Sequence, residues 1–483
     1  MRTLTNEIVN FAGKEVELRG WVHARRDHGK IIFIDLRDRG GIAQIVFTPH
    51  HSVKAGSMGQ APQSNTLYEL ANTLRSEWVV MVRGKVQERP KGMENEQIPT
   101  GTLEISAAHL EVLSKAETLP ISIDTDGYEI GEEVRMKYRY LDLRRPRLQK
   151  NLRMRHQVSN FCRDFLTKRE FVELETPILG RSTPEGARDY LVPSRLYPSA
   201  FYALPQSPQQ YKQLFMVSGF ERYFQIARCF RDEDTRGDRQ PEFTQLDVEL
   251  SFTNQEEVMA LIEELFTTMV GKLFPNHHIS EKPFSRLNYA AVMAEYGTDK
   301  PDLRENKEDP NELAFAFVVN FPMFEWKDQE KRWDAVHHPF TMPQVKDTVE
   351  FKTMFKKDPA KIFAYQYDLV LNGYEIGGGS IRIHDRELLS AVFEAMGNTP
   401  EDIREKFGHL LDAFAMGVPP HGGMAPGLDR FMMIMMGEPN IREVIAFPKT
   451  GDGRDLMTGA PAEVESKQLK ELGLSVEKQK TKK

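Results

Sequence analysis

The pattern of strand-like segments in the first 115 residues constrains the fold more than any other feature of the chain. Five short segments there combine β-branched and aromatic residues with alternating polarity, and turns bearing Gly, Pro or Asn separate them. The segments are Glu15–His23, Ile31–Leu36, Ala43–Phe47, Trp78–Val86 and Leu103–Leu113. Five strands in so short a stretch predict a small closed β-barrel, in a domain that covers residues 1–114.

A five-stranded barrel of this kind is typical of the OB-fold, which binds oligonucleotides, although a barrel with a purely structural role is the alternative. The charged stretch over residues 115–147 predicts a hinge helix and linker. From residue 148 to 476, amphipathic helices such as Asn151–Lys168 and Glu256–Leu273 alternate with strands, which predicts a large α+β domain. Residues 477–483 are lysine-rich and are expected to be disordered.

Composition excludes several classes of protein. With 483 residues, 40% of them hydrophobic, the chain is too long for one core of usual size, so we expect two or three domains. No window reaches the roughly 18 uninterrupted apolar residues of a membrane helix, and Met1–Lys14 does not resemble an export signal. Two cysteines, Cys162 and Cys229, are too few for a disulfide framework or a cysteine zinc site, which suits the cytoplasm. The net charge of −7 argues against coating of nucleic acid by bulk charge.

A strand, a charged loop and a second strand over residues 229–249 predict a hairpin suited to phosphate. Arg231 leaves the first strand, and the loop carries Arg236 and Arg239, whose guanidinium groups can fork onto phosphate oxygens. Phe243 on the return strand can stack a base. Taken alone, the segment is somewhat more consistent with a solvated, charged hairpin.

Two glycine-bearing segments add to this chemistry. Gly427–Arg430 opens an apolar helix, so Arg430 lies where the helix dipole favours anions. Asp368 and Glu375 on adjoining strands are suitable ligands for Mg²⁺, which proteins usually share with substrate phosphates. Residues 377–379 are three glycines that admit a ligand against the backbone, with a glycine bulge as the alternative. Because the sequence contains no Walker-type loop and no dinucleotide fingerprint, arginines would have to hold the phosphates.

These pieces, in this order, closely resemble aspartyl-tRNA synthetase of the bacterial type, over almost the whole chain. Glu170–Pro177 resembles the first motif of class II synthetases, which builds a homodimer interface around Pro177. Phe230–Glu233 resembles the second motif and Gly427–Arg430 the third. The resemblance implies an N-terminal OB-fold β-barrel joined to a class II catalytic domain built on an antiparallel sheet flanked by helices. Bacterial members usually carry an inserted domain, which is absent here at residues 304–313.

Two further segments, Thr183–Leu191 and Gln206–Lys212, separate this family from its asparaginyl and lysyl relatives. The resemblance implies that Lys212 and Arg382 face the side-chain carboxylate of L-aspartate, a group that suits two cations in a closed pocket. The other amino-acid contacts that it implies are Glu185 and Gln209 at the ammonium group, with Asp247, His337 and His338 nearby. The two histidines are not expected to be metal ligands, because adjacent residues on a strand face opposite sides.

For ATP, the resemblance implies three catalytic residues. Arg231 would bridge the aspartate carboxylate and the α-phosphate, Arg430 would hold the γ-phosphate, and Glu375 would carry Mg²⁺ together with Asp368. The other residues implied to contact ATP are Asp232, Glu233, Arg239, Gln240, Phe243, Gly427, Leu428 and Asp429. Attack of the aspartate carboxylate on ATP needs little proton transfer, so positioning and charge stabilisation would supply most of the catalysis.

The barrel is expected to read the anticodon of the aspartate tRNA, with Phe33 stacking on a base beside Arg26 and Gln44. A core position is the alternative for Phe33. Family members that also charge the asparagine tRNA often carry histidine at the place of His28 and glycine at that of Gly92, so the resemblance implies a non-discriminating enzyme. An amidotransferase acting on the mischarged tRNA would then be a functional partner. The competing hypotheses are a strictly aspartate-tRNA-specific enzyme, an inactive RNA-binding paralogue, and an enzyme that amidates free aspartate.

Overall fold

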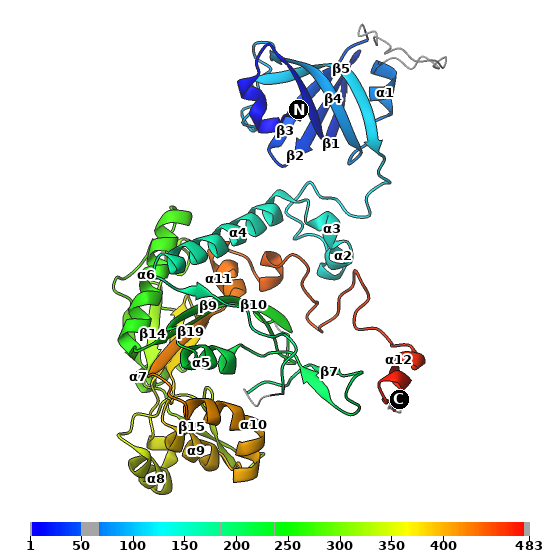
Figure 1. Ribbon diagram of the computed structural model, residues 1–483. Helices are drawn as coiled ribbons and strands as arrows, with labels where there is room; N and C mark the ends of the chain where they lie inside the picture. Colours follow the sequence, from blue (N-terminus) through cyan, green and yellow to red (C-terminus); the bar gives the residue numbers. More distant parts are fainter. Residues whose placement is uncertain (1, 50–66, 183–185, 236, 478–483) are drawn as a thin grey trace. The chain divides into compact units, whose positions relative to one another are not determined.

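The computed structural model describes residues 2–49, 67–182, 186–235 and 237–477. The chain forms two compact units, Met1–Ser122 and Ile123–Lys483 (Figure 1). Glu185 and the predicted tail beyond Glu477 lie outside the described residues. Among the described helices, none combines the length and the apolar character that crossing a membrane requires.

The first unit is a closed five-stranded barrel with the strand order β1-β2-β3-β5-β4, as predicted. The first strand is longer than expected, because its residues as far as His28 pair with the second strand. Ile32, Ile34 and Leu36 alternate into the barrel core, so the residues between them lie on its outer face. The elements are η1 (Thr5–Asn10), β1 (Glu15–His28), β2 (Ile31–Asp38), β3 (Gly41–Phe47), α1 (Leu67–Thr73), β4 (Val79–Glu88) and β5 (Leu103–Ser114).

The second unit is built on an eight-stranded sheet with the order β12-β14-β17-β18-β19-β10-β9-β6. The sheet is antiparallel except at the pairs β12–β14 and β6–β9, which confirms the predicted architecture. Its strands are β6 (Val172–Glu173), β9 (Arg222–Phe230), β10 (Glu242–Ser251), β12 (Ser285–Asn288), β14 (Phe315–Val319), β17 (Gln366–Leu371), β18 (Tyr374–Ile381) and β19 (His421–Pro426). Shorter strands outside this sheet are β7 (Leu191–Pro193), β8 (Phe201–Ala203), β11 (His278–Ile279), β13 (Glu312–Leu313), β15 (Phe324–Lys327) and β16 (Arg332–Ala335).

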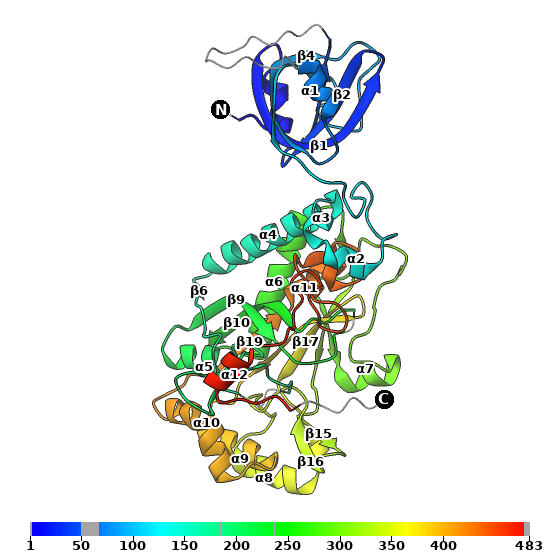
Figure 2. The same cartoon turned by 90° about the vertical axis from the view of Figure 1, so that its right-hand side faces the viewer.

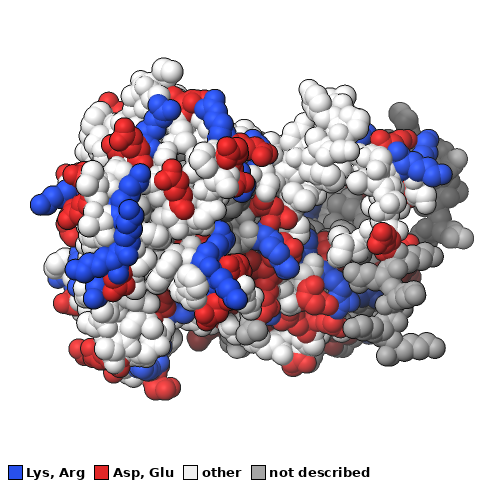
Figure 3. All heavy atoms as spheres, turned by 90° about the horizontal axis from the view of Figure 1, so that it is seen from below, with Lys and Arg blue, Asp and Glu red and all other residues white. Residues whose placement is uncertain are grey.

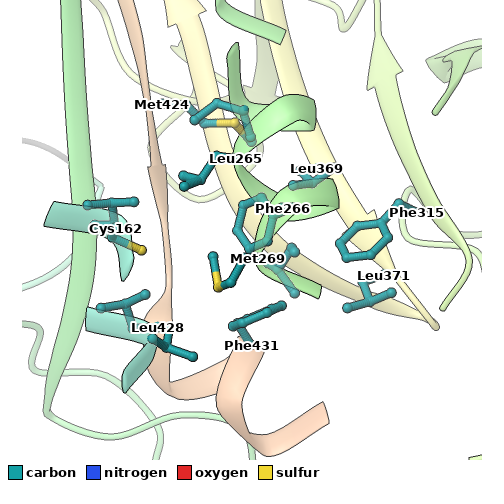
Figure 4. Close-up of a cluster of buried hydrophobic side chains, with 14 of the residues drawn as sticks. Cys162, Leu265, Phe266, Met269, Phe315, Leu369, Leu371, Met424, Leu428 and Phe431 are labelled. Carbon is teal, nitrogen blue, oxygen red and sulfur yellow. The ribbon is translucent and has the colours of Figure 1, made fainter. Parts of the chain in front are cut away.

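Helices cover one face of this sheet, where the main core lies (Figures 1 and 2). The helices of the unit are α2 (Glu132–Lys137), α3 (Arg139–Asp142), α4 (Pro146–Thr167), α5 (Gln209–Val217), α6 (Gln255–Leu273), α7 (Tyr289–Tyr296), α8 (Thr348–Lys357), α9 (Arg386–Ala395), α10 (Pro400–Phe414), α11 (Leu428–Met435) and α12 (Ser466–Glu471), with the 3₁₀ turns η2 (Pro359–Lys361) and η3 (Ile441–Val444). Phe266 from α6 packs between Phe315 of β14 and Phe431 of α11 (Figure 4). Full burial of each such side chain contributes about 1.5–3 kcal/mol.

The opposite face of the sheet is left for polar side chains. On β10, Leu246 and Val248 enter the helix-covered core, so the alternating residues Gln245, Asp247 and Glu249 lie on the other face. The alternation of side chains along β10 therefore places charged groups on the face of the sheet opposite the main core.

A second hydrophobic cluster lies in a lobe formed by β15, β16, α8, α9 and α10. Phe340 belongs to this cluster, which anchors the bend that carries His337 and His338. Viewed from below Figure 1, acidic and basic side chains are interspersed over the surface and do not form one cationic field (Figure 3).

Candidate active site

A cavity of about 350 Å³ brings together most of the residues predicted to bind ATP and aspartate. Residues of both predicted sets that line it are Gln209, Lys212, Arg231, Glu233, Arg239, Gln240, Phe243, Asp247, His337, His338, Glu375, Arg382, Gly427, Asp429 and Arg430. Three predicted residues, Asp232, Asp368 and Leu428, do not line the cavity in the described part of the chain. The predicted ammonium contact Glu185 is outside the described residues.

Two cations, Lys212 and Arg382, line the end of the cavity that is predicted to bind the amino acid, and two buried carboxylates pair with them. Lys212 on α5 is 2% exposed, and its Nζ lies 2.9 Å from Asp247 Oδ1 and 3.3 Å from Glu249 Oε2. Arg382 donates through Nε and Nη2 to the two carboxylate oxygens of Glu249, at 2.9 and 3.1 Å. The cations are thus already paired inside the protein, because burying them alone would cost several kcal/mol each.

Glu249 was missed by the sequence reasoning. Burial opposes its charged form, but Arg382 and Lys212 outweigh burial and lower the pKa of Glu249 to about 2. Burial raises the pKa of the neighbouring Asp247, an effect that Lys212 offsets only in part. A signal was present in the sequence, since Gln245, Asp247 and Glu249 recur at every second position of one strand and therefore share a face.

Replacing Glu249 with glutamine is expected to destabilise the fold by about 3 kcal/mol at neutral pH, because Arg382 loses its buried counter-charge. A carboxyl group whose folded pKa is depressed contributes stability above its unfolded pKa, and the contribution is lost as the pH falls through the folded value. The stability difference between the native protein and E249Q should therefore shrink between about pH 4.5 and pH 2. Urea unfolding at several pH values measures this, and a difference independent of pH would contradict the ion-pair explanation.

The two histidines do not face opposite sides, so that expectation was wrong. They lie in a bend after β16 and not in a strand, and their rings stack with centroids 4.3 Å apart. Burial lowers the pKa of His337 to about 3 and that of His338 well below its usual value, so both rings are neutral. Neutral His338 accepts a hydrogen bond at Nε2 from Arg382 Nη1, at 2.7 Å. Among the described residues, no cluster of three or more His, Cys, Asp or Glu is arranged to hold a metal ion.

The end of the cavity that is predicted to bind phosphate is lined by Arg231 and Arg430, which both have unused donors. Arg231 follows β9 directly, and its guanidinium carbon lies 5.0 Å from the centre of the Phe243 ring. Arg430, the third residue of α11, pairs with Asp238 at 3.0 Å and donates to the backbone carbonyl of Glu375. The buried Nε atoms of both arginines have no hydrogen-bond partner within the described part of the chain. Unsatisfied cationic donors that open onto a cavity suit an anionic ligand.

Several residues predicted to contact ATP use their side chains within the protein. The carboxylate of Asp429 accepts from the backbone N–H of Thr244 at 2.7 Å and pairs with Arg155. Gln240 exchanges two hydrogen bonds with the backbone of Lys449, at 3.1 and 2.7 Å. Leu428 belongs to the main core. Asp232 lies 3.6 Å from Arg188 in an exposed ion pair. These contacts hold the hairpin and α11 in place.

The predicted magnesium ligands lie on neighbouring strands, β17 and β18. Asp368 is buried, and burial followed by the charge of Glu375 raises its pKa well above the usual value. Two carboxylates that repel each other at low dielectric are a fitting place for a divalent cation. A Cβ atom on Gly378 would lie 3.1 Å from Asp368 Oδ1 and 3.3 Å from His337 Nε2, so a glycine is needed between the two groups.

The other two glycines of residues 377–379 are required by packing. A Cβ atom on Gly377 would meet the Pro426 backbone at 2.7 Å, and one on Gly379 would meet both the Gly423 carbonyl and the Tyr367 ring at 2.5 Å. The register of β17 and β18 also shifts between Leu369 and Val370, which places a bulge at Ile376, directly before these glycines. Access of a ligand to the glycine backbone stays a prediction.

In the barrel, Phe33 is half-buried on the outer face and not in the core. Beside it, Arg26 Nη2 lies 2.8 Å from Asp35 Oδ1 and 3.3 Å from Gln44 Oε1, and Gln44 donates to Glu104 at 2.9 Å. The predicted determinants of tRNA scope are exposed: His28 ends β1, and Gly92 lies in the β4–β5 connection with a φ of 82°. Phe33, Arg26 and Gln44 thus form one polar and aromatic patch.

Comparisons with known proteins agree with this arrangement. Residues 131–451 match the family described as tRNA synthetases class II (D, K and N), and residues 16–113 match the OB-fold nucleic acid binding domain. The chain is 41% identical to a protein of Dehalococcoides mccartyi named aspartate-tRNA(Asp/Asn) ligase, over 99% of this chain and 98% of that protein. It is 42% identical to a protein of the same name from Dictyoglomus turgidum, over 96% of both chains.

Solved structures show the same fold at lower identity. The asparaginyl-tRNA synthetase of Pyrococcus horikoshii, complexed with asparaginyl-adenylate, superposes with a TM-score of 0.72 at 24% identity, covering 93% of this chain and 98% of that chain. The aspartyl-tRNA synthetase of Entamoeba histolytica gives a TM-score of 0.70 at 24% identity, covering 93% of this chain and 91% of that chain.

The relatives are longer than this chain. The alignment with the Dehalococcoides protein spans 610 residues against the 483 of this chain, so at least 127 residues of that relative have no counterpart here. The position of the shortening at residues 304–313 stays a prediction. The full-length similarity, the family match over residues 131–451 and the barrel together lead to one conclusion. The chain belongs to the class II tRNA synthetases of the D, K and N group.

Proposed function

We propose that this protein is an aspartate-tRNA ligase that activates L-aspartate with ATP and transfers it to both the aspartate and the asparagine tRNA. The observation that carries the proposal is the cavity in which Lys212 and Arg382 lie at one end and Arg231 and Arg430 at the other. Cations at both ends suit a substrate carboxylate and a triphosphate. Relatives 41–42% identical to this chain are named for ligation of aspartate to both tRNAs, which supports the proposed scope.

In the first step, the α-carboxylate of aspartate attacks the α-phosphorus of ATP and pyrophosphate leaves. Arg231 holds the reacting oxygens together, Arg430 holds the departing phosphates, and Phe243 stacks on the adenine. Lys212 and Arg382 bind the side-chain carboxylate, and Gln209, which lines the same cavity, faces the ammonium group. The substrate carboxylate can replace His338 as the hydrogen-bond partner of Arg382. Because His338 is neutral, this exchange leaves no buried charge unpaired.

In the second step, a terminal ribose hydroxyl of the tRNA attacks the aspartyl-adenylate, and the leaving phosphate accepts the proton. Mg²⁺ would be held by Asp368 and Glu375, where it would neutralise charge on the ATP phosphates. Burial, followed by the charge of Glu375, raises the pKa of Asp368, and a cation between the two carboxylates would offset both effects, which supports their role as its ligands.

The first test is a charging assay with the purified protein, labelled aspartate, ATP, Mg²⁺ and transcripts of both tRNAs. Charging of both transcripts at similar efficiency is expected. Charging of the aspartate transcript alone would leave a strictly specific enzyme, and charging of neither would favour an inactive RNA-binding paralogue. That paralogue is disfavoured because Arg231, Glu375 and Arg430 all line one cavity. An enzyme amidating free aspartate would have no use for the barrel.

Replacing His28 with leucine is expected to lower charging of the asparagine transcript about tenfold relative to the aspartate transcript. The two anticodons differ in one base, and a single contact is typically worth about 1–3 kcal/mol, of which 1.4 kcal/mol is tenfold. His28 is exposed at the end of β1, so its removal should not alter the barrel core. The ratio of kcat/KM for the two transcripts measures the effect, and an unchanged ratio would contradict a role for His28 in tRNA scope.

We further propose that the protein is a homodimer assembled around the first motif. Several large apolar side chains are exposed close to Pro177 in the sequence, among them Val172, Ile178 and Leu179. An exposed apolar surface of this kind indicates a protein interface. Sedimentation should give about twice the 55.5 kDa mass of the chain. The tRNA substrates and the small number of cysteines suit the cytoplasm, where an amidotransferase would convert the mischarged asparagine tRNA.

A further inference from the structure

The hinge that precedes α4 contains buried arginines, whereas the arginines of a solvated linker would be exposed. Arg135, Arg139 and Arg145 are at most 4% exposed. Burying a guanidinium group costs several kcal/mol unless charged or polar partners compensate. Partners of Arg135 and Arg139 come from residues 438–446, some 300 positions later in the chain and within the same compact unit. We call these residues the wall segment.

Arg139 is the main support of the wall-segment backbone. Its guanidinium donates to the carbonyl oxygens of Arg442 at 2.6 Å, Ile445 at 2.9 Å and Ala446 at 2.9 Å. Its fourth partner, Asp142 at 2.8 Å, keeps the group charged and oriented. The wall segment contains only one short element of regular structure, the 3₁₀ turn η3. Most of its backbone carbonyls therefore need hydrogen-bond donors from other parts of the chain.

Two glutamates tie the same segment to the hinge and to α4. Glu443 accepts two hydrogen bonds from Arg135, at 3.1 and 2.7 Å, and one from Arg147 at 2.8 Å. Glu438 accepts from the hydroxyl of Tyr128 at 2.7 Å and from the side chain of Asn151 at 2.6 Å. The wall segment is therefore held from behind by charge-assisted bonds, the strong class of hydrogen bond.

The other side of the wall segment borders the cavity. Ile441 lines the cavity, and its N–H donates to the carbonyl of Gly237 in the charged loop, at 3.2 Å. Just beyond the segment, the backbone of Lys449 holds the side chain of Gln240. These contacts lie at the phosphate and adenine end, whereas the amino-acid end is built on α5, β10 and β18.

We propose that Arg139, supported by Glu438 and Glu443, is a positioning residue for ATP: by holding the wall segment it places Ile441 and the charged loop against the nucleotide. The inference rests on the proposed adenylate-forming reaction. Lysine in place of Arg139 keeps the charge but cannot reach three carbonyls with one ammonium group. The ATP end should loosen while the aspartate end keeps its geometry.

The experiment is aspartate-dependent ATP–pyrophosphate exchange by the full-length protein and the variant R139K. We expect the KM for ATP to rise about fivefold, with the KM for aspartate within about twofold of the native value. The variant E438Q, which keeps the shape of the side chain and removes its charge, should change the KM for ATP in the same direction by about twofold. E438Q also serves if R139K does not fold.

Arg286→Lys is the matched control. Arg286 donates to Glu263 at 2.6 Å and to the carbonyl of Phe284, and neither partner lines the cavity. R286K should lower the melting temperature and leave both KM values unchanged. Unchanged ATP KM in folded R139K or E438Q, or equal changes in both KM values, would overturn the proposal. Absence of exchange by the native protein would instead refute the proposed function.

Discussion

Replacement of Arg231 with methionine is expected to lower kcat/KM for aspartate-dependent ATP–pyrophosphate exchange by about a thousandfold or more. An arginine placed on the charge that develops during phosphoryl or nucleotidyl transfer is typically worth about 10³–10⁵ in rate. Arg231 is placed for this role, because its buried Nε has no partner among the described residues and its guanidinium lies over Phe243 at the cavity. Methionine keeps most of the side-chain volume, so the fold should be little affected.

Arg228 offers a matched control on β9, the strand that Arg231 directly follows. It pairs with Glu242 and donates to Thr244 Oγ1 at 3.2 Å, and it is not among the residues that line the cavity. R228M should retain exchange activity within a few fold. Comparable losses in R228M and R231M would mean that the hairpin is merely destabilised, which would remove Arg231 from the reaction.

Replacement of Lys212 with methionine is expected to lower kcat/KM for aspartate by about 10²–10³-fold, the equivalent of roughly 3–4 kcal/mol. The variant removes the cation that pairs with both Asp247 and Glu249. Of the ion pairs described for this cluster, only the one between Arg382 and Glu249 is then left. The pocket then carries excess negative charge and repels the substrate carboxylate. Because Lys212 lies at the amino-acid end, the KM for ATP should change little.

Exchange kinetics with each substrate varied in turn measure this selectivity. Lys272→Met on α6 is the control, since Lys272 is exposed and contacts the ring of Phe161. K272M should behave as the native protein does. If K212M raised the KM for ATP as much as that for aspartate, the assignment of Lys212 to the amino-acid end would be wrong. Asparagine as a substrate provides a second readout, because the lost cation should reduce the preference for aspartate over asparagine.

Local patterns in the sequence predicted much of the fold. Alternation in the first 115 residues led to the five barrel strands, and amphipathic periodicity led to α4 and α6 within a few residues of their ends. The main deviation, the extension of β1 to His28, comes from pairing with β2, and pairing between strands is not visible in the local pattern of either. Motif residues such as Arg231 and Arg430 could be proposed from the sequence, because the ability of a guanidinium group to bind phosphate is a property of the side chain itself.

What the sequence alone determined about this protein is therefore its two kinds of domain, its family resemblance and the residues that can carry charge to phosphate and carboxylate. Tertiary structure decided how those charges are paired. Glu249 neutralises both Lys212 and Arg382, the bend after β16 stacks His337 on His338, and hinge arginines satisfy carbonyls some 300 residues away. The physical reason is that the free energy of a buried charge depends on its neighbours in space, which only the folded chain brings together.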